Sequence, residues 1–188
     1  MPPKQRITKE MLLSHAFDIA KEKGILAVTS RSVAQSVGCS IRPVFSQFPT
    51  MEELRKSTFE YTSNKFMQEI LKNQDKPDFM TQTNIWLLNL ARNEPRIFEL
   101  LYLSESYTSS NLWDVMSEWE CNRKIISAFE QKYGLTSTEC KDIFQRAFFM
   151  LFGVAAMIAK GKIDISNEEV LDMIKRTVTQ MTGSQKGQ

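Results

Sequence analysis

Apolar residues recur every three or four positions along most of this chain, a spacing that places them on one face of an α-helix. Near the N-terminus, Leu12, Ala16 and Ala20 share one face, while Glu10 and Lys21 lie opposite. No segment alternates apolar and polar residues as a β-strand does, so we expect an all-α fold. The pattern predicts helices over about residues 8–23, 30–37, 40–47, 50–73, 75–93, 96–103, 111–132, 137–160 and 166–181.

Capping residues and glycines mark the ends of these predicted helices. In a capping box, a Ser or Thr side chain bonds the backbone N–H three residues on, and a Glu at that position reaches back. Gly24 and Gly161 are predicted C-terminal stops, and Ser40 is the predicted N-cap of the third helix. The predicted capping boxes are Thr50–Glu53, Thr136–Glu139 and Ser166–Glu169.

Composition narrows the class of protein. The 188 residues are 42% hydrophobic and 24% charged, as in a folded soluble domain. A net charge of +2 excludes a protein that binds polyanions by bulk charge alone. His15 is the single histidine, and Cys39, Cys121 and Cys140 form no C-x-x-C motif. We therefore expect reduced thiols, no metal site, no cofactor and no catalytic residues.

Two segments bear on localisation. The N-terminal Met1–Arg6 stretch is not followed by an apolar core, so we expect no signal peptide. The longest apolar run, residues 147–159, is shorter than the roughly 20 residues of a membrane span and predicts a buried helix. We expect a cytoplasmic protein without a membrane partner.

The segment from Ser30 to Gln47 has the features of a helix-turn-helix. Ala34 is small enough for two helices to approach, Gly38 allows a tight turn, Ser40 can cap the second helix, and Val44 can anchor it. A short turn makes the second helix cross the first steeply, so that it can enter a DNA major groove. The same pattern also fits the end of a plain three-helix bundle.

Residues 8–56 resemble the N-terminal domain of the tetracycline-repressor (TetR) family of transcription regulators, in one gapless register. The resemblance implies a helix-turn-helix DNA-binding domain over residues 1–50. It also implies a larger helical domain over 51–188 that binds a small effector and dimerises. The residues that carry it are Ala16-Phe17, Gly24, Thr29, Val33-Ala34, Gly38-Cys39-Ser40, Val44-Phe45, Phe48 and Glu52-Glu53-Leu54.

Three positions depart from the usual pattern of this family: Arg42 replaces a Gly, Phe45 a Tyr and Met51 a Lys. Phe45 and Met51 lack the groups that commonly touch phosphates, whereas Arg42 can bind a guanine edge or a phosphate. Ile41 and Pro43 fit either a thymine methyl or local packing, and Thr29, Ser30 and Thr50 fit either phosphates or helix caps. The predicted DNA-binding residues are Lys4, Arg6, Thr29, Ser30, Arg31, Ser40, Ile41, Arg42, Pro43, Phe45, Ser46, Gln47 and Thr50.

The distribution of charge fits a division into a DNA-binding N-terminal domain and a larger helical domain. Residues 1–60 contain 9 Lys and Arg against 6 Asp and Glu, a net charge of +3. Residues 61–188 contain 15 against 16, a net charge of −1. Because the basic excess is small, DNA affinity must come from the placement of contacts and from their duplication in a dimer.

The larger domain is rich in Met and aromatic residues, which form adaptable apolar cavities. Each residue alone also fits a simple core position. We expect an apolar or aromatic effector to contact Trp86, Tyr102, Trp113 and Phe148. The segment 144–158 is apolar on more than one helix face, which favours a four-helix dimer interface over a helix buried in a monomer. The predicted dimer residues are Phe149, Phe152, Gly153, Ala156, Leu171, Ile174 and Val178.

The leading hypothesis is a homodimeric transcriptional regulator, a repressor, that binds a palindromic DNA operator and is released by an apolar effector. An alternative is a protein-interaction module that has this fold but weakened DNA binding. A helical enzyme is the least favoured, because Glu94, Glu99 and Glu105 form no paired helical motif and His15 lies within the first helix.

Overall fold

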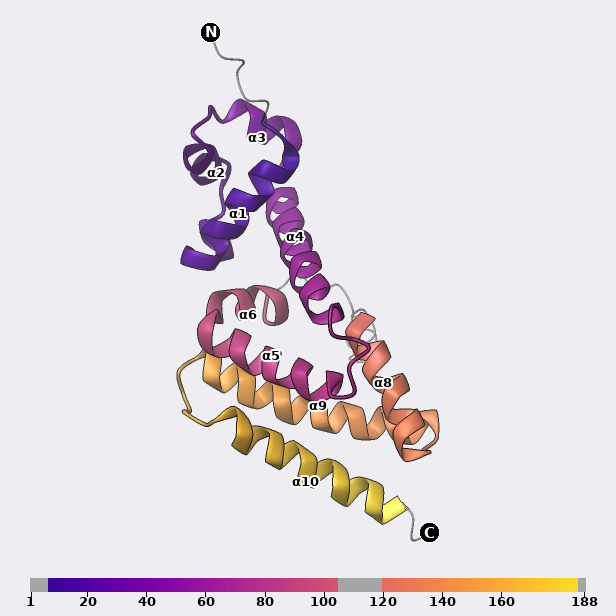
Figure 1. Cartoon of the computed structure of the whole chain (residues 1–188). Coiled ribbons are helices and arrows are strands. Elements are labelled where there is room, and N and C mark those ends of the chain that lie inside the picture. The colour runs from indigo at the N-terminus through magenta and orange to yellow at the C-terminus, as the bar shows by residue number, and fades with distance from the viewer. Residues whose placement is uncertain (1–6, 105–119, 186–188) are drawn as a thin grey trace. The chain divides into compact units, whose positions relative to one another are not determined.

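A computed structural model describes residues 7–104 and 120–185, and within them it contains helices and no strand (Figure 1). The all-α prediction is confirmed. A 3₁₀ turn, η1 (Ile25–Ala27), links the first two α-helices. The α-helices are α1 (Lys9–Lys23), α2 (Ser30–Val37), α3 (Arg42–Gln47), α4 (Met51–Leu71), α5 (Phe79–Asn93), α6 (Pro95–Tyr102), α8 (Glu120–Tyr133), α9 (Ser137–Ala159) and α10 (Asn167–Gln185).

Most predicted helix ends that the structure describes lie within two residues of the observed ones, because the capping signals were strong. The start predicted at residue 111 lies outside the described residues, and α10 continues to Gln185, four residues beyond its predicted end. The Thr136 and Ser166 hydroxyls accept from the backbone N–H groups of Glu139 and Glu169, at 3.4 Å and 3.2 Å. The start predicted at residue 75 for α5 is wrong. Successive turns occupy the residues up to Asp78, and α5 begins only at Phe79.

The chain forms two compact units, and the first contains residues 7–66 and 96–104 of the described chain. Its core is continuous from α1 through α4, and Leu100 of α6, 2% exposed, belongs to the same cluster. The single histidine joins two of its helices, since His15 Nδ1 lies 2.8 Å from Ser36 Oγ. The buried members of this core are Leu12, Ala16, Ile19, Ala20, Val28, Val33, Ala34, Val44, Phe48, Leu54 and Leu100.

The second unit contains residues 67–95 and 120–185 of the described chain. In it, α9 packs against α5, α8 and α10 (Figure 1). One end is fixed by Arg92 of α5, which donates to Asn167 Oδ1 at 2.8 Å and to the Ile165 carbonyl at 2.6 Å. At the other end, Cys140 and Ile143 of α9 form a small apolar cluster. Burial raises the pKa of the Cys140 thiol, which favours the neutral form.

Helix α9 is the most apolar helix of the described chain. By length and composition alone it could cross a membrane, but only 22% of its most apolar window is buried by the rest of the chain. Leu151, Ala155 and Ile158 are buried, whereas Phe149 is 49% and Met157 46% exposed. The expectation of a simply buried helix is therefore wrong for one face of α9.

Candidate nucleic-acid interface and ligand cavity

The turn between α2 and α3 follows from one glycine. Gly38 has φ 75° and ψ 33°, the left-handed backbone conformation, which other residues adopt only at a cost in free energy. Its N–H donates to the Gln35 carbonyl at 3.2 Å, and the Cys39 N–H donates to the Ala34 carbonyl at 2.9 Å. These two bonds form a Schellman motif, which ends α2 and reverses the chain towards α3.

The start of α2 is a capping box built from Thr29 and Ser32. The Thr29 hydroxyl accepts from the Ser32 N–H at 3.0 Å, and the Thr29 N–H donates to Ser32 Oγ at 2.9 Å. Ser32 Oγ also donates to the Ala27 carbonyl at 2.8 Å, which ties the 3₁₀ turn to the helix. Thr29 therefore caps α2, which is one of the two roles predicted for it.

Ser30 departs from its predicted DNA-binding role. Its side chain is 4% exposed, and its hydroxyl donates to the Met51 sulfur at 3.4 Å. This side chain is packed between α2 and the start of α4, and its hydroxyl is already bonded to Met51. The neighbouring Arg31 is exposed.

Helix α3 begins later than predicted. Ile41 occupies the N-cap position with helical dihedrals and no side-chain cap, so the N-cap role expected of Ser40 is wrong. The Ile41 carbonyl accepts from the N–H groups of both Val44 and Phe45, at 3.1 and 3.2 Å. Pro43 fits this first turn because its missing N–H would have no partner there.

The outer face of α3 combines apolar and polar side chains. Val44 is fully buried and anchors the helix in the core of the first unit. Ile41 is 42% and Phe45 47% exposed, at positions four residues apart on one helix face. The other exposed predicted contacts here are Ser40, Arg42, Ser46, Gln47 and Thr50, and Pro43 is half-buried. Lys4 and Arg6 lie outside the described residues.

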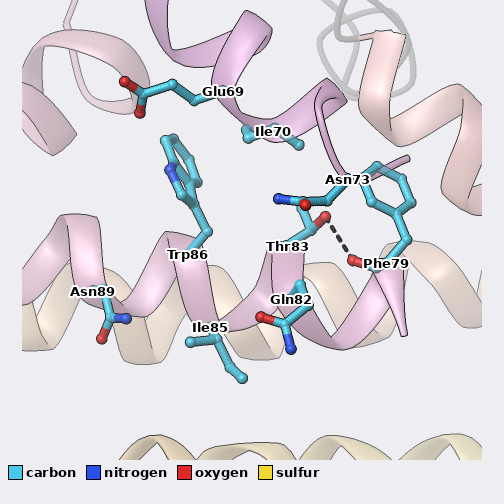
Figure 2. A pocket seen from close by; sticks show the side chains of 9 residues that line it. All are labelled: Glu69, Ile70, Asn73, Phe79, Gln82, Thr83, Ile85, Trp86 and Asn89. Atoms are coloured by element: carbon cyan, nitrogen blue, oxygen red, sulfur yellow. Dashed lines mark hydrogen bonds between the residues drawn. The ribbon is translucent and has the colours of Figure 1, made fainter. Parts of the chain in front are cut away.

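A cavity of about 210 Å³ lies in the second unit, between the end of α4 and α5 (Figure 2). Figure 2 shows Trp86 rising from α5 towards Glu69 of α4. Among the described residues that line it, Glu69 alone is charged. The lining residues are Glu69, Ile70, Asn73, Phe79, Gln82, Thr83, Ile85, Trp86 and Asn89.

Comparison with solved structures identifies this arrangement. A TetR-like transcriptional regulator from Rhodococcus sp. RHA1 superposes with a TM-score of 0.63 at 14% identity, covering 93% of this chain and 97% of that chain. The multidrug binding protein EbrR, solved in complex with ethidium, gives a TM-score of 0.62 at 16% identity, with coverages of 94% and 99%. The fold is TetR-like.

A second TetR transcriptional regulator from Rhodococcus sp. RHA1 gives a TM-score of 0.53 at 17% identity, covering 92% of this chain and 93% of that chain. No family model and no curated protein sequence matches the chain. At these identities the likeness establishes the TetR-like fold across nearly the whole chain. It does not assign a role to any single residue.

Three of the four predicted ligand contacts lie within the described residues, on three different helices of this TetR-like fold. Trp86 lines the cavity. Tyr102 is in the first unit, where its ring lies 5.2 Å from that of Phe98. Phe148 stacks with Phe144 and Phe152 along α9 and does not line the cavity. Trp113 lies outside the described residues.

The predicted dimer residues also divide into groups. Phe149 and Gly153 are exposed, at i and i+4 on the open face of α9. Ile174 is 9% exposed and packed within its own unit, so it cannot contribute much to an interface. Val178 packs against the Cys140–Ile143 cluster. The half-buried members of the predicted dimer set are Phe152, Ala156, Leu171 and Val178.

Sequence reasoning missed two sets of residues. One is Arg55 of α4, whose guanidinium donates to the carbonyls of Leu26 at 3.2 Å and Val28 at 3.4 Å and so holds the link between α1 and α2. The other is the polar part of the cavity lining. An available signal was the short connection from α4 to α5, because neighbouring helices joined by a short link face one another. Within the described residues no group of three His, Cys, Asp or Glu is placed to hold a metal.

Proposed function

We propose that this protein is a DNA-binding transcriptional repressor that acts as a homodimer on a palindromic operator. The observation that carries the proposal is the helix-turn-helix of the first unit, in which α3 is anchored by Val44 and presents Arg42 outwards. A guanidinium there can bind a guanine edge through two hydrogen bonds or pair with a phosphate. Arg31 and Lys9, also exposed, add positive charge on the same unit.

The homodimer part of the proposal rests on the open face of α9. Phe149, Gly153 and Met157 follow one another at four-residue spacing, and all three are exposed. A Cβ atom at Gly153 would meet no atom within 4 Å, so the helix has room for a close neighbour there. A palindromic site then requires the two α3 helices to lie about 34–36 Å apart.

The effector part of the proposal rests on the cavity beside Trp86. An aromatic ligand that stacks on this indole would contact α4 and α5 together, and by changing their packing it would favour a dimer unable to bind DNA. The ethidium complex of EbrR is consistent with an aromatic ligand in a TetR-like fold. At about 210 Å³ the cavity is smaller than most drug-sized sites, so it fits a ligand of a few rings or must widen on binding.

A gel shift tests the DNA-binding proposal. The DNA flanking the gene should bind in a sequence-preferring, salt-sensitive manner, and Arg42→Ala should weaken binding by roughly tenfold or more. Arg96→Ala is the matched control, because it removes the same charge from an exposed site outside the helix-turn-helix. If wild-type protein shows no preference for any DNA sequence, the regulator proposal fails.

Tryptophan fluorescence tests the effector proposal. Titration with planar aromatic compounds should quench emission, raise the melting temperature and release the DNA. Trp86→Phe should weaken binding, whereas Phe148→Leu, outside the cavity, should leave it unchanged. A broad compound set that neither quenches emission nor shifts melting would contradict an open ligand site.

A protein-interaction module is the second candidate function, and the exposed Phe45 favours it. A Phe cannot donate a hydrogen bond to a phosphate, and with Ile41 it gives α3 an apolar face. Under this alternative, a partner protein binds at α3 with DNA absent, and Arg42→Ala changes no DNA affinity because there is none to change.

A further inference from the structure

The fold of the first unit leaves two apolar side chains exposed at α3. Ile41 and Phe45 are 42% and 47% exposed, although the first unit buries the apolar faces of α1 and α2. They lie one helical turn apart, on either side of the exposed Arg42 and the half-buried Pro43. Neither side chain can hydrogen-bond a phosphate or the polar edge of a base.

The DNA major groove contains one apolar group that such residues can contact, the 5-methyl group of thymine. In a helix-turn-helix the N-terminal residues of the second helix face the base edges, and Ile41 and Arg42 occupy that end of α3. Phe45 lies one turn further along the same face. A helix of this kind can therefore contact thymine methyls two or more base pairs apart, with a polar contact between them.

We infer that α3 recognises thymine methyl groups, with Ile41 and Phe45 as the specificity-determining side chains and Arg42 reading a neighbouring guanine. This inference rests on the proposed DNA-binding function and names the chemical groups that α3 recognises. It predicts half-sites in which thymines flank a G·C base pair.

Charge favours DNA over an apolar protein surface as the occupant of this face. The exposed cations Lys9, Arg31 and Arg42 belong to the same unit as Ile41 and Phe45, and no acidic residue lies between Gly24 and Thr50. A polyanion with apolar groups in its groove matches a segment of this composition, in which cations can contact phosphates while the apolar side chains contact bases.

The test starts from a duplex of about 30 base pairs selected by the full-length protein from a random pool, long enough for two half-sites. Each thymine of the selected site is then replaced by deoxyuridine, which removes only the methyl group. At two positions per half-site, affinity should fall about three- to five-fold per methyl, as expected for the loss of one buried methyl contact. Replacement of thymines outside the half-sites should leave affinity unchanged.

Protein variants assign each methyl group to a side chain. Phe45→Ala should weaken binding to the thymine duplex and abolish the penalty for deoxyuridine at one position, and Ile41→Ala should do so at the other. Leu103→Ala is the matched control, since Leu103 is 44% exposed in the same unit but lies outside the helix-turn-helix. Unchanged melting temperatures would show that each variant is folded.

The outcomes separate the inference from the function on which it depends. Selection of a specific site that binds deoxyuridine as well as thymine would overturn methyl recognition and leave DNA binding in place. A penalty for deoxyuridine that persists in both Phe45→Ala and Ile41→Ala would also overturn it. If no sequence is selected and a partner protein is captured only when Phe45 is present, the proposed DNA-binding function itself is wrong.

Discussion

The first and second units both leave large apolar side chains exposed, but they differ in what surrounds them. On α3, Ile41 and Phe45 lie beside exposed Arg42 in a segment without acidic residues. On α9, Phe149 and Met157 are separated by Gly153, with no charged residue between Arg146 and Lys160. The first face is suited to a polyanion with apolar groups. The second is suited to another apolar helix, such as that of a second copy of the chain.

The two units also differ in how completely each covers the apolar faces of its own helices. In the first unit, the apolar stripes of α1 and α2 are buried within the unit by α3, α4 and α6. In the second, α9 is buried on one side only, although it packs against three helices. The first unit therefore completes its own core, and we expect the second to depend on a partner for part of its stability.

The largest expected effect comes from the core of the first unit. Leu12→Ala removes a fully buried side chain and should lower the free energy of unfolding by about 2–5 kcal/mol, with loss of DNA binding. Leu13→Ala, at a half-buried neighbour, should cost clearly less. Urea unfolding followed by circular dichroism measures both. Equal losses would mean that the core of α1 is not where the structure places it.

The next effect tests the proposed dimer interface on α9. At Gly153 a Cβ atom would meet nothing within 4 Å in the single chain, and Leu has a better helix propensity than Gly, so Gly153→Leu should not destabilise the monomer. The larger side chain should block close approach of α9 to a second copy and raise the dimer dissociation constant by at least tenfold. Gly153→Ala is the milder control. Sedimentation at micromolar concentration that shows unchanged assembly would move the interface away from α9.

The smallest effect concerns the capping boxes of α9 and α10. Hydrogen bonds from the side chain and then the backbone of Thr136 hold the pKa of Glu139 below its ordinary value, and Ser166 does the same for Glu169. A lowered pKa in the folded state stabilises the protein above the ordinary value near 4.5, and this stability is lost as the pH falls through the lowered pKa.

Variants of the two caps test this pH dependence. Thr136→Ala and Ser166→Ala should each lower the melting temperature at neutral pH, and the effect should shrink as the pH falls through the lowered pKa of each carboxyl, because a protonated carboxyl loses the bonds that favour its charged form. Thr8→Ala is a useful comparison, since its cap to the Met11 N–H involves no carboxylate. A loss from Thr136→Ala that is constant with pH would exclude the contribution of Glu139.

The sequence predicted local structure better than it predicted contacts between distant elements. The helices, the Gly38 turn and the capping boxes of α9 and α10 depend on residues within one or two turns of each other, so their patterns are visible in the sequence. Ser40 failed as an N-cap because Ile41 and Pro43 together determine where α3 begins. The burial of Ser30 depends on Met51, which lies 21 residues away.

The ligand and dimer residues were harder to predict for the same physical reason. Trp86, Tyr102 and Phe148 are alike in chemistry, and only the fold distributes them among a cavity, an α6 aromatic pair and an α9 stack. Ile174 fits the apolar stripe of an amphipathic helix, and that pattern cannot distinguish the chain's own core from a partner. Glu69 and Asn89 of the lining have no local signal at all.

The presence of Leu100 in the core of the first unit has a consequence for synthesis on the ribosome. The unit needs residues 7–66 and then α6, while the segment 67–95 between them belongs to the other unit. At about 5–20 residues per second, the nascent helix-turn-helix must wait a few seconds for Leu100. A product truncated before α6 would lack this side chain, so first units with a complete core would come mainly from chains that continue into the second unit.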